Sequence, residues 1–133
     1  MDYFFKTVML IDDDSTDQFI NQALISASLF SLKKIVKLSS DTAIDFLTNE
    51  AVQTDQVPDL IFLDIRMPIA DGFDFLDEFK LLPEAVTKKT KIVMLSSTMS
   101  ESDISRAREN KLVRFLIHKP LSLEKLSDLR ARL

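Results

Sequence analysis

Residues 59–76 read DLIFLDIRMPIADGFDFL, an apolar run that ends in a carboxylate and then turns into a helix. The run of residues 60–63 is uninterrupted and lies between two prolines, Pro58 and Pro68. Such a run is typical of a strand buried on both faces of a parallel sheet. Because a lone buried charge is costly, we expect Asp64 at the carboxyl-end edge of that sheet, where open α/β folds place their ligand crevice.

The residues that follow Asp64 predict a turn and then a helix. Pro68 and the pair Asp71-Gly72 are typical turn residues. The apolar face of the predicted helix consists of Phe75, Leu76, Phe79 and Leu82. Gly72 is the only glycine in the chain, so we expect it to mark the position where the backbone most needs conformational freedom.

Four further apolar segments predict additional strands of the same sheet, at residues 7–11, 35–38, 91–95 and 113–117. Lysines flank the segment 35–38, as expected of an edge strand. The segments between the strands predict helices, one beginning at Ser15 and the others capped by Ser40 or Asp41, by Ser100 and by Ser122. Strands that alternate with helices predict an α/β fold, a (βα)5 doubly wound parallel sheet, in a single domain spanning residues 1–133.

The first predicted helix carries two local patterns. Ser15 and Gln18 have the spacing of a capping box, in which each side chain bonds an exposed amide of the other. The apolar positions that we expect to face the core are Phe19, Ile20, Ala23, Leu24 and Ala27.

The composition restricts the class of protein. A hydrophobic content of 46% and a charged content of 29% are typical of a soluble globular protein. The chain has no cysteine, which excludes disulfides and thiolate metal sites and fits a reducing compartment such as the cytoplasm. A net charge of −4 argues against direct binding of nucleic acid. The first eleven residues lack the order of regions of a signal peptide, so we expect no membrane insertion.

Polar side chains collect where the predicted strands end. They are Asp12, Asp13, Asp14, Asp64, Ser96 and Lys119. In a parallel sheet these strand ends share one edge. Two unit charges ~4 Å apart repel by about 1 kcal/mol in water and about 4 kcal/mol at an effective dielectric constant of ~20, so clustered acids require a cation. Oxygen ligands at a half-open site suit Mg²⁺, and Lys119 suits a phosphate. This combination favours phosphoryl transfer to a carboxylate.

The motifs LIDDD (10–14), FLDIRMPIADGFDFL (62–76), IVMLSS (92–97) and IHKPLS (117–122) resemble, in this order and spacing, the receiver domains of two-component response regulators. The resemblance covers essentially the whole chain. It implies a flavodoxin-like sheet with the strand order 2-1-3-4-5, which is the order of a chemotaxis receiver that serves as the standard example of this fold. It also implies that the protein is a phosphorylation-dependent signalling switch that takes part in its own phosphotransfer and autodephosphorylation. By this resemblance the protein is not a conventional enzyme.

The resemblance also implies roles for individual residues. Asp64 matches the phosphorylated aspartate, and the expected ligands of Mg²⁺ (or Mn²⁺) are Asp12, Asp13, Asp64 and the backbone carbonyl of Arg66. Asp13 would bind the ion directly and Asp12 through water. Asp14 is expected to serve only as an acid at the start of a helix.

Further matches concern the surroundings of Asp64. Lys119 matches the lysine that pairs with the phosphoryl group, and Ser96 matches the switch hydroxyl. Pro120 would follow a cis peptide bond, and Gly72 would lie in the turn after the phosphorylation site. Arg66 and Thr98 occupy positions that tune the lifetime of the phosphoryl group in this family.

Two positions depart from the family pattern. Leu116 stands where the family usually has an aromatic switch residue, and alternation along the strand predicts that Phe115 faces the opposite way. The turn before the last strand lacks the usual glycine, and Asn110 is the residue that we expect in the left-handed conformation.

The partners that the resemblance implies are a sensor histidine kinase or a histidine phosphotransfer protein and an unknown downstream protein. The downstream protein would bind the face made by the helix after Ser100, the strand 113–117 and the helix after Ser122.

Two alternatives to this function remain. One is a small Mg²⁺ phosphatase similar to the haloacid dehalogenase group, which would need an acid where Arg66 stands. The other is a receiver-like scaffold that is never phosphorylated.

Overall fold

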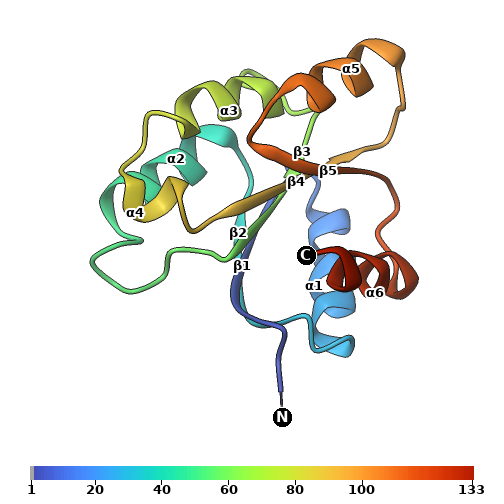
Figure 1. Cartoon of the computed structure of the whole chain (residues 1–133), viewed down its shortest axis with the longest axis horizontal. Coiled ribbons are helices and arrows are strands. Elements are labelled where there is room, and N and C mark those ends of the chain that lie inside the picture. The colour runs from blue at the N-terminus through green and yellow to red at the C-terminus, as the bar shows by residue number, and fades with distance from the viewer. Residues whose placement is uncertain (1) are drawn as a thin grey trace.

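The computed structural model describes residues 2–133 and contains one five-stranded sheet with helices on both faces (Figure 1). All the strand pairs are parallel, in the order β2-β1-β3-β4-β5. The strands are β1 (Phe5–Ile11), β2 (Ser31–Lys37), β3 (Leu60–Asp64), β4 (Lys91–Ser96) and β5 (Val113–His118). The predicted fold class and strand order are both confirmed.

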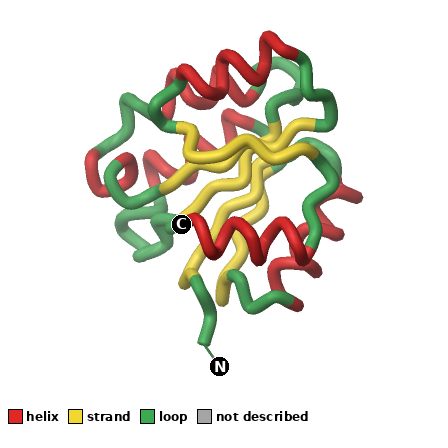
Figure 2. Tube along the Cα trace, turned by 45° about the vertical axis from the view of Figure 1, so that its right-hand side comes forward, coloured by secondary structure: helices red, strands yellow, loops and turns green. Residues whose placement is uncertain are grey.

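Two groups of helices cover the two faces of the sheet (Figures 1 and 2). The helices are α1 (Ser15–Ala27), α2 (Ser40–Asn49), α3 (Gly72–Phe79), α4 (Glu84–Thr87), α5 (Glu101–Glu109) and α6 (Leu123–Arg132). One apolar core lies between the sheet and α1 and α6, and the other lies between the sheet and α2, α3 and α5. The central strand β3 is buried along its whole length because it contributes to both cores.

The register of the strands explains why polar residues gather at one edge. Leu63 of β3 pairs with Ile11, the last residue of β1, and Asp64 pairs with Leu95 of β4. β1, β3 and β4 therefore end almost level with one another. Any side chain in the first residues beyond these strands lies at the same edge of the sheet.

The short helix α4 was not predicted from the sequence. The predicted helix after Gly72 ends at Phe79, and Leu82 lies beyond it, half-buried against the core. Pro83 then begins α4 as its N-cap residue, because proline is accepted at a helix start but not in a helix interior. The helices after Ser100 and Ser122 are consequently α5 and α6.

The sequence interpretation of α1 was wrong in two respects. The N-cap residue is Asp14 and not Ser15, since its carboxylate accepts hydrogen bonds from the amides of Thr16 and Asp17. The buried face consists of Gln18, Asn21 and Ile25. Of the apolar residues expected to face the core, Leu24 is half-buried and packs against it. The other four are exposed: Phe19, Ile20, Ala23 and Ala27.

The predictions for the other helix ends were partly right. Ser100 and Ser122 cap α5 and α6 with their hydroxyls, as expected. The predicted cap of α2 at Ser40 or Asp41 is wrong, because Ser39 is the N-cap and the helix itself begins at Ser40. Asn110 has φ −85° and ψ 115°, so the predicted left-handed conformation is wrong; in the described chain, non-glycine residues with positive φ are Leu29, Asp55 and Ile69.

Gly72 is required by a close approach of two backbones. Its φ is not positive, so the expectation of unusual conformational freedom was wrong. A Cβ atom at this position would lie 2.7 Å from the carbonyl oxygen of Asp64 and 3.0 Å from the Cα atom of Ile65. The Gly72 amide donates a hydrogen bond of 2.8 Å to the Ile65 carbonyl. The first turn of α3 can therefore pack against the end of β3 only without a side chain.

We expect Gly72→Ala to lower the free energy of unfolding by about 1 to 3 kcal/mol, since the new methyl group would collide with backbone atoms that cannot move aside. Urea unfolding measures this loss. Ser15→Ala is the matched control, because Ser15 is likewise the first helical residue but is exposed, and a change within roughly 0.5 kcal/mol is expected. Equal stability of the two variants would contradict the proposed collision.

Candidate functional site

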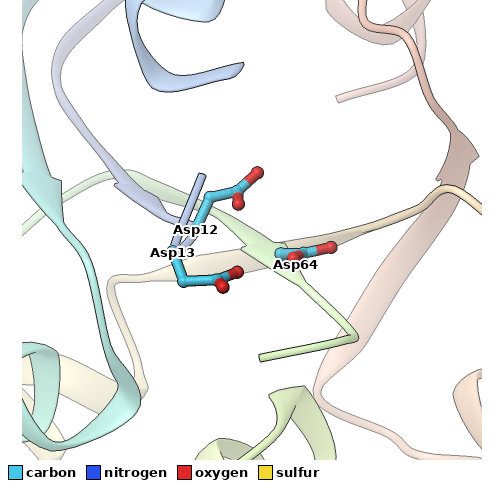
Figure 3. Close-up of side chains that lie close together, drawn as sticks. All are labelled: Asp12, Asp13 and Asp64. Carbon is cyan, nitrogen blue, oxygen red and sulfur yellow. The ribbon is translucent and has the colours of Figure 1, made fainter. Parts of the chain in front are cut away.

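Three carboxylates meet at the carboxyl-end edge of the sheet. Asp12 and Asp13 directly follow β1, and Asp64 is the last residue of β3; one oxygen of each lies within 4.8 Å of the others. Figure 3 shows the three side chains pointing toward the same space. Asp12 and Asp64 are buried, whereas Asp13 is exposed. The structure thus brings together the three residues that the sequence singled out as acidic ligands.

The side chain of Gln18 holds the loop after β1 in place. Its amide nitrogen donates hydrogen bonds to the carbonyl oxygens of Leu10, Asp12 and Lys37, at 3.0, 3.1 and 3.2 Å respectively. It therefore joins the ends of β1 and β2 beneath the acidic residues. Sequence reasoning missed this role because Gln18 was assigned to a capping box.

Lys119 brings a positive charge to the acidic cluster. Its ammonium nitrogen lies 2.9 Å from Asp12 Oδ2, 3.1 Å from Asp17 Oδ2 and 3.2 Å from Asp64 Oδ1. The Lys119 amide donates to the carbonyl of Ser96, and the Lys119–Pro120 bond is cis. The cis bond agrees with the family resemblance. Asp17 was not predicted as a site residue, although its position one turn into the first helix places it next to Asp13 and Asp14.

Burial and neighbouring charges change the protonation of two groups. Burial, together with the charges of Asp12 and Asp13, raises the pKa of Asp64 to about 6, although Lys119 opposes the rise. Burial disfavours the charged form of Lys119. Its hydrogen bond to Asp12 and the charges of Asp64 and Asp12 outweigh that effect, so the pKa of Lys119 lies above its usual value. Lys119 is therefore charged at neutral pH, and it lies beside Asp64, whose pKa of about 6 is close to neutral pH.

The hydroxyl of Ser96 bonds within its own loop. It donates to the carbonyl oxygen of Thr98 and accepts a hydrogen bond of 3.2 Å from the Thr98 amide. Ser96 is buried at the end of β4, beside Asp64 in the register of the strands.

The side chain of Arg66 forms an ion pair with α5. Its Nη2 atom lies 2.5 Å from Oδ2 of Asp103, whose side chain is only 3% exposed. Asp103 was not predicted as a functional residue. A buried acid in the first turn of a helix cannot be distinguished by sequence alone from the exposed acids that commonly occupy such positions.

Leu116 and Phe115 lie on opposite faces of β5, as the alternation predicted. Leu116 packs against the core that contains α2, α3 and α5, and Phe115 packs against the core that contains α1 and α6. The position of the usual aromatic switch therefore carries a leucine, and Phe115 does not replace it on that face of the strand.

The donor set fits a hard divalent cation. Three carboxylates at a half-open edge offer only oxygen ligands, which is the chemistry that Mg²⁺ prefers. Both oxygens of Asp12 already accept hydrogen bonds, one from the Asp14 amide and one from Lys119. Asp13 is exposed and Asp64 faces it, so these two are the acids most available for direct coordination.

Comparison with known proteins identifies the family. The model of the response regulator receiver domain matches residues 8–130. The chain belongs to the response regulator receiver domain family. Protein PilG of Pseudomonas aeruginosa is 34% identical over 119 residues, which cover 90% of this chain and 80% of that protein.

Solved receiver structures superpose closely on this one. A two-component response regulator from Cytophaga hutchinsonii is 29% identical, with a TM-score of 0.86 over 96% of this chain and 95% of that chain. A response regulator receiver protein from Dyadobacter fermentans is 32% identical, with a TM-score of 0.83 over 96% of both chains.

Membership of the receiver domain family settles the broad function. Receiver domains are phosphoacceptor switches of two-component signalling rather than conventional enzymes, which disfavours the phosphatase alternative. Histidine kinases and phosphotransfer proteins are the partners of such domains. In residues 2–133 no helix is both long and apolar enough to span a membrane.

In metal-free buffer, Asp64→Asn should raise the free energy of unfolding near neutral pH by roughly 1 to 3 kcal/mol. The pKa of Asp64 rises from 3.8 in the unfolded chain to about 6 in the folded chain, so its charged form costs stability above about pH 6 and this cost vanishes toward about pH 4. The advantage of the variant should therefore shrink as the pH falls. Urea unfolding at several pH values measures it.

Asp55→Asn provides a control of opposite sign. The hydrogen bond and charge of Lys6 lower the pKa of the Asp55 carboxyl, so this variant should lose stability at neutral pH and the difference should fade in acid. If the difference in free energy of unfolding between Asp64→Asn and wild type did not change with pH, the raised pKa of Asp64 would be wrong.

Proposed function

We propose that this chain is a single receiver domain, spanning residues 1–133, that accepts a phosphoryl group on Asp64 from a phosphohistidine. The donor is a sensor histidine kinase or a histidine phosphotransfer protein. The observation that carries the proposal is the convergence of Asp12, Asp13 and Asp64 with the ammonium group of Lys119 at 3.2 Å from Asp64. The Asp64 carboxylate would be the nucleophile, and the ammonium group beside it would stabilise charge on the oxygens of an incoming phosphoryl group.

In the transfer step a carboxylate oxygen of Asp64 attacks the phosphorus atom. The bond between phosphorus and the histidine nitrogen breaks, and its electron pair returns to the imidazole of the donor. Lys119 already touches Asp64 Oδ1, so its charge offsets the negative charge that accumulates on the phosphoryl oxygens. Asp12, Asp13, Asp64 and the carbonyl of Arg66 would hold Mg²⁺ (or Mn²⁺), which would supply further charge neutralisation.

The phosphorylated state would differ at Ser96. Its hydroxyl would leave the carbonyl of Thr98 and donate to a phosphoryl oxygen, because a charged acceptor forms the stronger hydrogen bond. The loop from Ser96 leads directly into α5. The change would therefore reach the face made by α5, β5 and α6, where we propose that an unidentified downstream protein binds.

The proposal also covers the residues around the site and the location of the protein in the cell. Arg66 and Thr98 would tune the rate of autodephosphorylation, and Pro120 and Gly72 would hold the surrounding loops in place. We place the chain in the cytoplasm, without direct binding to nucleic acid. The absence of cysteine and the net charge of −4 support these assignments.

Incubation with acetyl phosphate and Mg²⁺, followed by intact-mass measurement, tests the proposal. We expect the wild-type chain to gain one phosphoryl group and Asp64→Asn to gain none. Asp55→Asn, which removes an acid far from the site, should be phosphorylated like wild type. Continuous hydrolysis of the donor without a lasting adduct would favour a phosphatase, and no adduct at all would favour a scaffold; either result overturns the proposal.

The outward apolar face of α1 supports docking of the phosphodonor protein beside the site. Phe19 is 75% exposed and Ile20 is 47% exposed. Ile20 also lines a groove that includes Lys119 and Pro120. A protein that covers this face of α1 would deliver its histidine next to Asp64.

Phe19→Ala should slow phosphotransfer from a histidine phosphotransfer protein by about tenfold, the equivalent of roughly 1.4 kcal/mol of lost docking energy. The rate with acetyl phosphate should stay unchanged, because that donor needs no docking surface. Val52→Ala is the control, since Val52 is an apolar residue beyond α2 that is 48% exposed. Equal slowing with both donors would show that Phe19 acts on the site itself and would contradict docking.

A further inference from the structure

The ion pair between Arg66 and Asp103 connects the phosphorylation site to α5. Arg66 follows Asp64 by two residues, and Asp103 lies in the first turn of α5. Within residues 2–133, Arg66 is the side chain that pairs with the Asp103 carboxylate, at 2.5 Å. A direct charged contact therefore joins the loop after β3 to the helix that follows β4.

The two partners differ in how much freedom they have. The side chain of Asp103 is 3% exposed, whereas that of Arg66 is 57% exposed. The guanidinium is thus free to move through solvent, but the carboxylate is fixed in a buried position. A buried carboxylate that loses its cation is strongly disfavoured, so the place of α5 depends on where Arg66 is.

Little else holds α5 against the domain. Ala107 is its only buried apolar residue, and Ile104 is half-buried. The other charged contact places the guanidinium of Arg106 at 3.9 Å from the ring centroid of Phe73, at the start of α3. An element with so little apolar contact moves at low cost.

We propose that Arg66 exchanges partners when Asp64 is phosphorylated, and that this exchange releases α5. Asp103 is a positioning residue that acts through Arg66. The phosphoryl group adds negative charge two residues from Arg66, and a guanidinium binds phosphate oxygens in a fork geometry. Once Arg66 turns to the phosphoryl group, Asp103 is left buried without its cation. The first turn of α5 then moves until the carboxylate reaches water.

The exchange satisfies the requirement for a conformational switch. A phosphoryl group shifts an equilibrium only if it interacts differently with the two states. Arg66 supplies that difference, because it is available to the phosphoryl group only when it is not bound to Asp103. This coupling rests on the proposed phosphorylation of Asp64 and is separate from the rotation of the Ser96 hydroxyl.

Hydrogen exchange of the amides of residues 101–109, measured with and without acetyl phosphate and Mg²⁺, tests the proposal. In the wild-type chain, phosphorylation should speed exchange in α5 by at least about fivefold, the lower end of typical coupling between two sites. Arg66→Ala should show fast exchange in both states, because Asp103 has already lost its cation. Asp103→Asn should show slow exchange in both states, because no buried charge remains.

Two further variants separate this coupling from general damage to α5. Arg66→Lys keeps the positive charge and should retain the response of α5 to phosphorylation. Arg108→Ala removes an exposed arginine from the same helix and should behave as wild type. An α5 that responds to phosphorylation equally in wild type, Arg66→Ala and Asp103→Asn would overturn the inference.

Intact-mass measurement on the same samples reports the phosphoryl adduct independently. If wild type forms no adduct, the proposed function itself fails. If the adduct forms and exchange in α5 does not change, the proposed function stands and the exchange of partners by Arg66 is wrong.

Discussion

Lys119 holds the carboxylates of Asp12, Asp17 and Asp64 within 3.2 Å of its ammonium nitrogen. Asp12 and Asp64 are buried, and a buried acid without a cation nearby would disrupt the end of its strand. The ammonium group lowers the pKa of Asp64, but burial and then the charges of Asp12 and Asp13 outweigh it and raise the pKa to about 6. The site therefore keeps a surplus of negative charge that favours the arrival of a metal ion. Lys119 thus links the acids at the ends of β1 and β3 to the residue that follows β5.

The sheet could be predicted from the sequence because its signals are local. Residues 60–63 are apolar without interruption and end in Asp64, and this pattern alone indicates a buried parallel strand and its functional end. The residues that gather at the edge follow from that inference, since every parallel strand ends there. The same reasoning placed Ser96 and Lys119 correctly beside Asp64, because they too follow directly from strand ends.

The errors occurred where tertiary contacts outweigh a local pattern. In α1 the apolar residues suggested one inward face, but Gln18 turns inward because three carbonyl oxygens at the ends of β1 and β2 need a donor. That rotation leaves Phe19 in solvent. Gly72 was recognised as special for the wrong reason, since the constraint is the neighbouring backbone of Asp64 rather than its own φ angle. The sequence alone predicts neither the close approach of the Gly72 and Asp64 backbones nor the pairing of Asp103 with Arg66.

The contact between Lys119 and Asp12 joins residues that are 107 positions apart. The lysine can reach the acids only after residue 119 has left the ribosome. During synthesis, a shorter nascent chain already carries Asp12, Asp13 and Asp64 but lacks the cation that completes the pocket. The complete arrangement of charges at this edge therefore forms only after β5 and Lys119 have been synthesised.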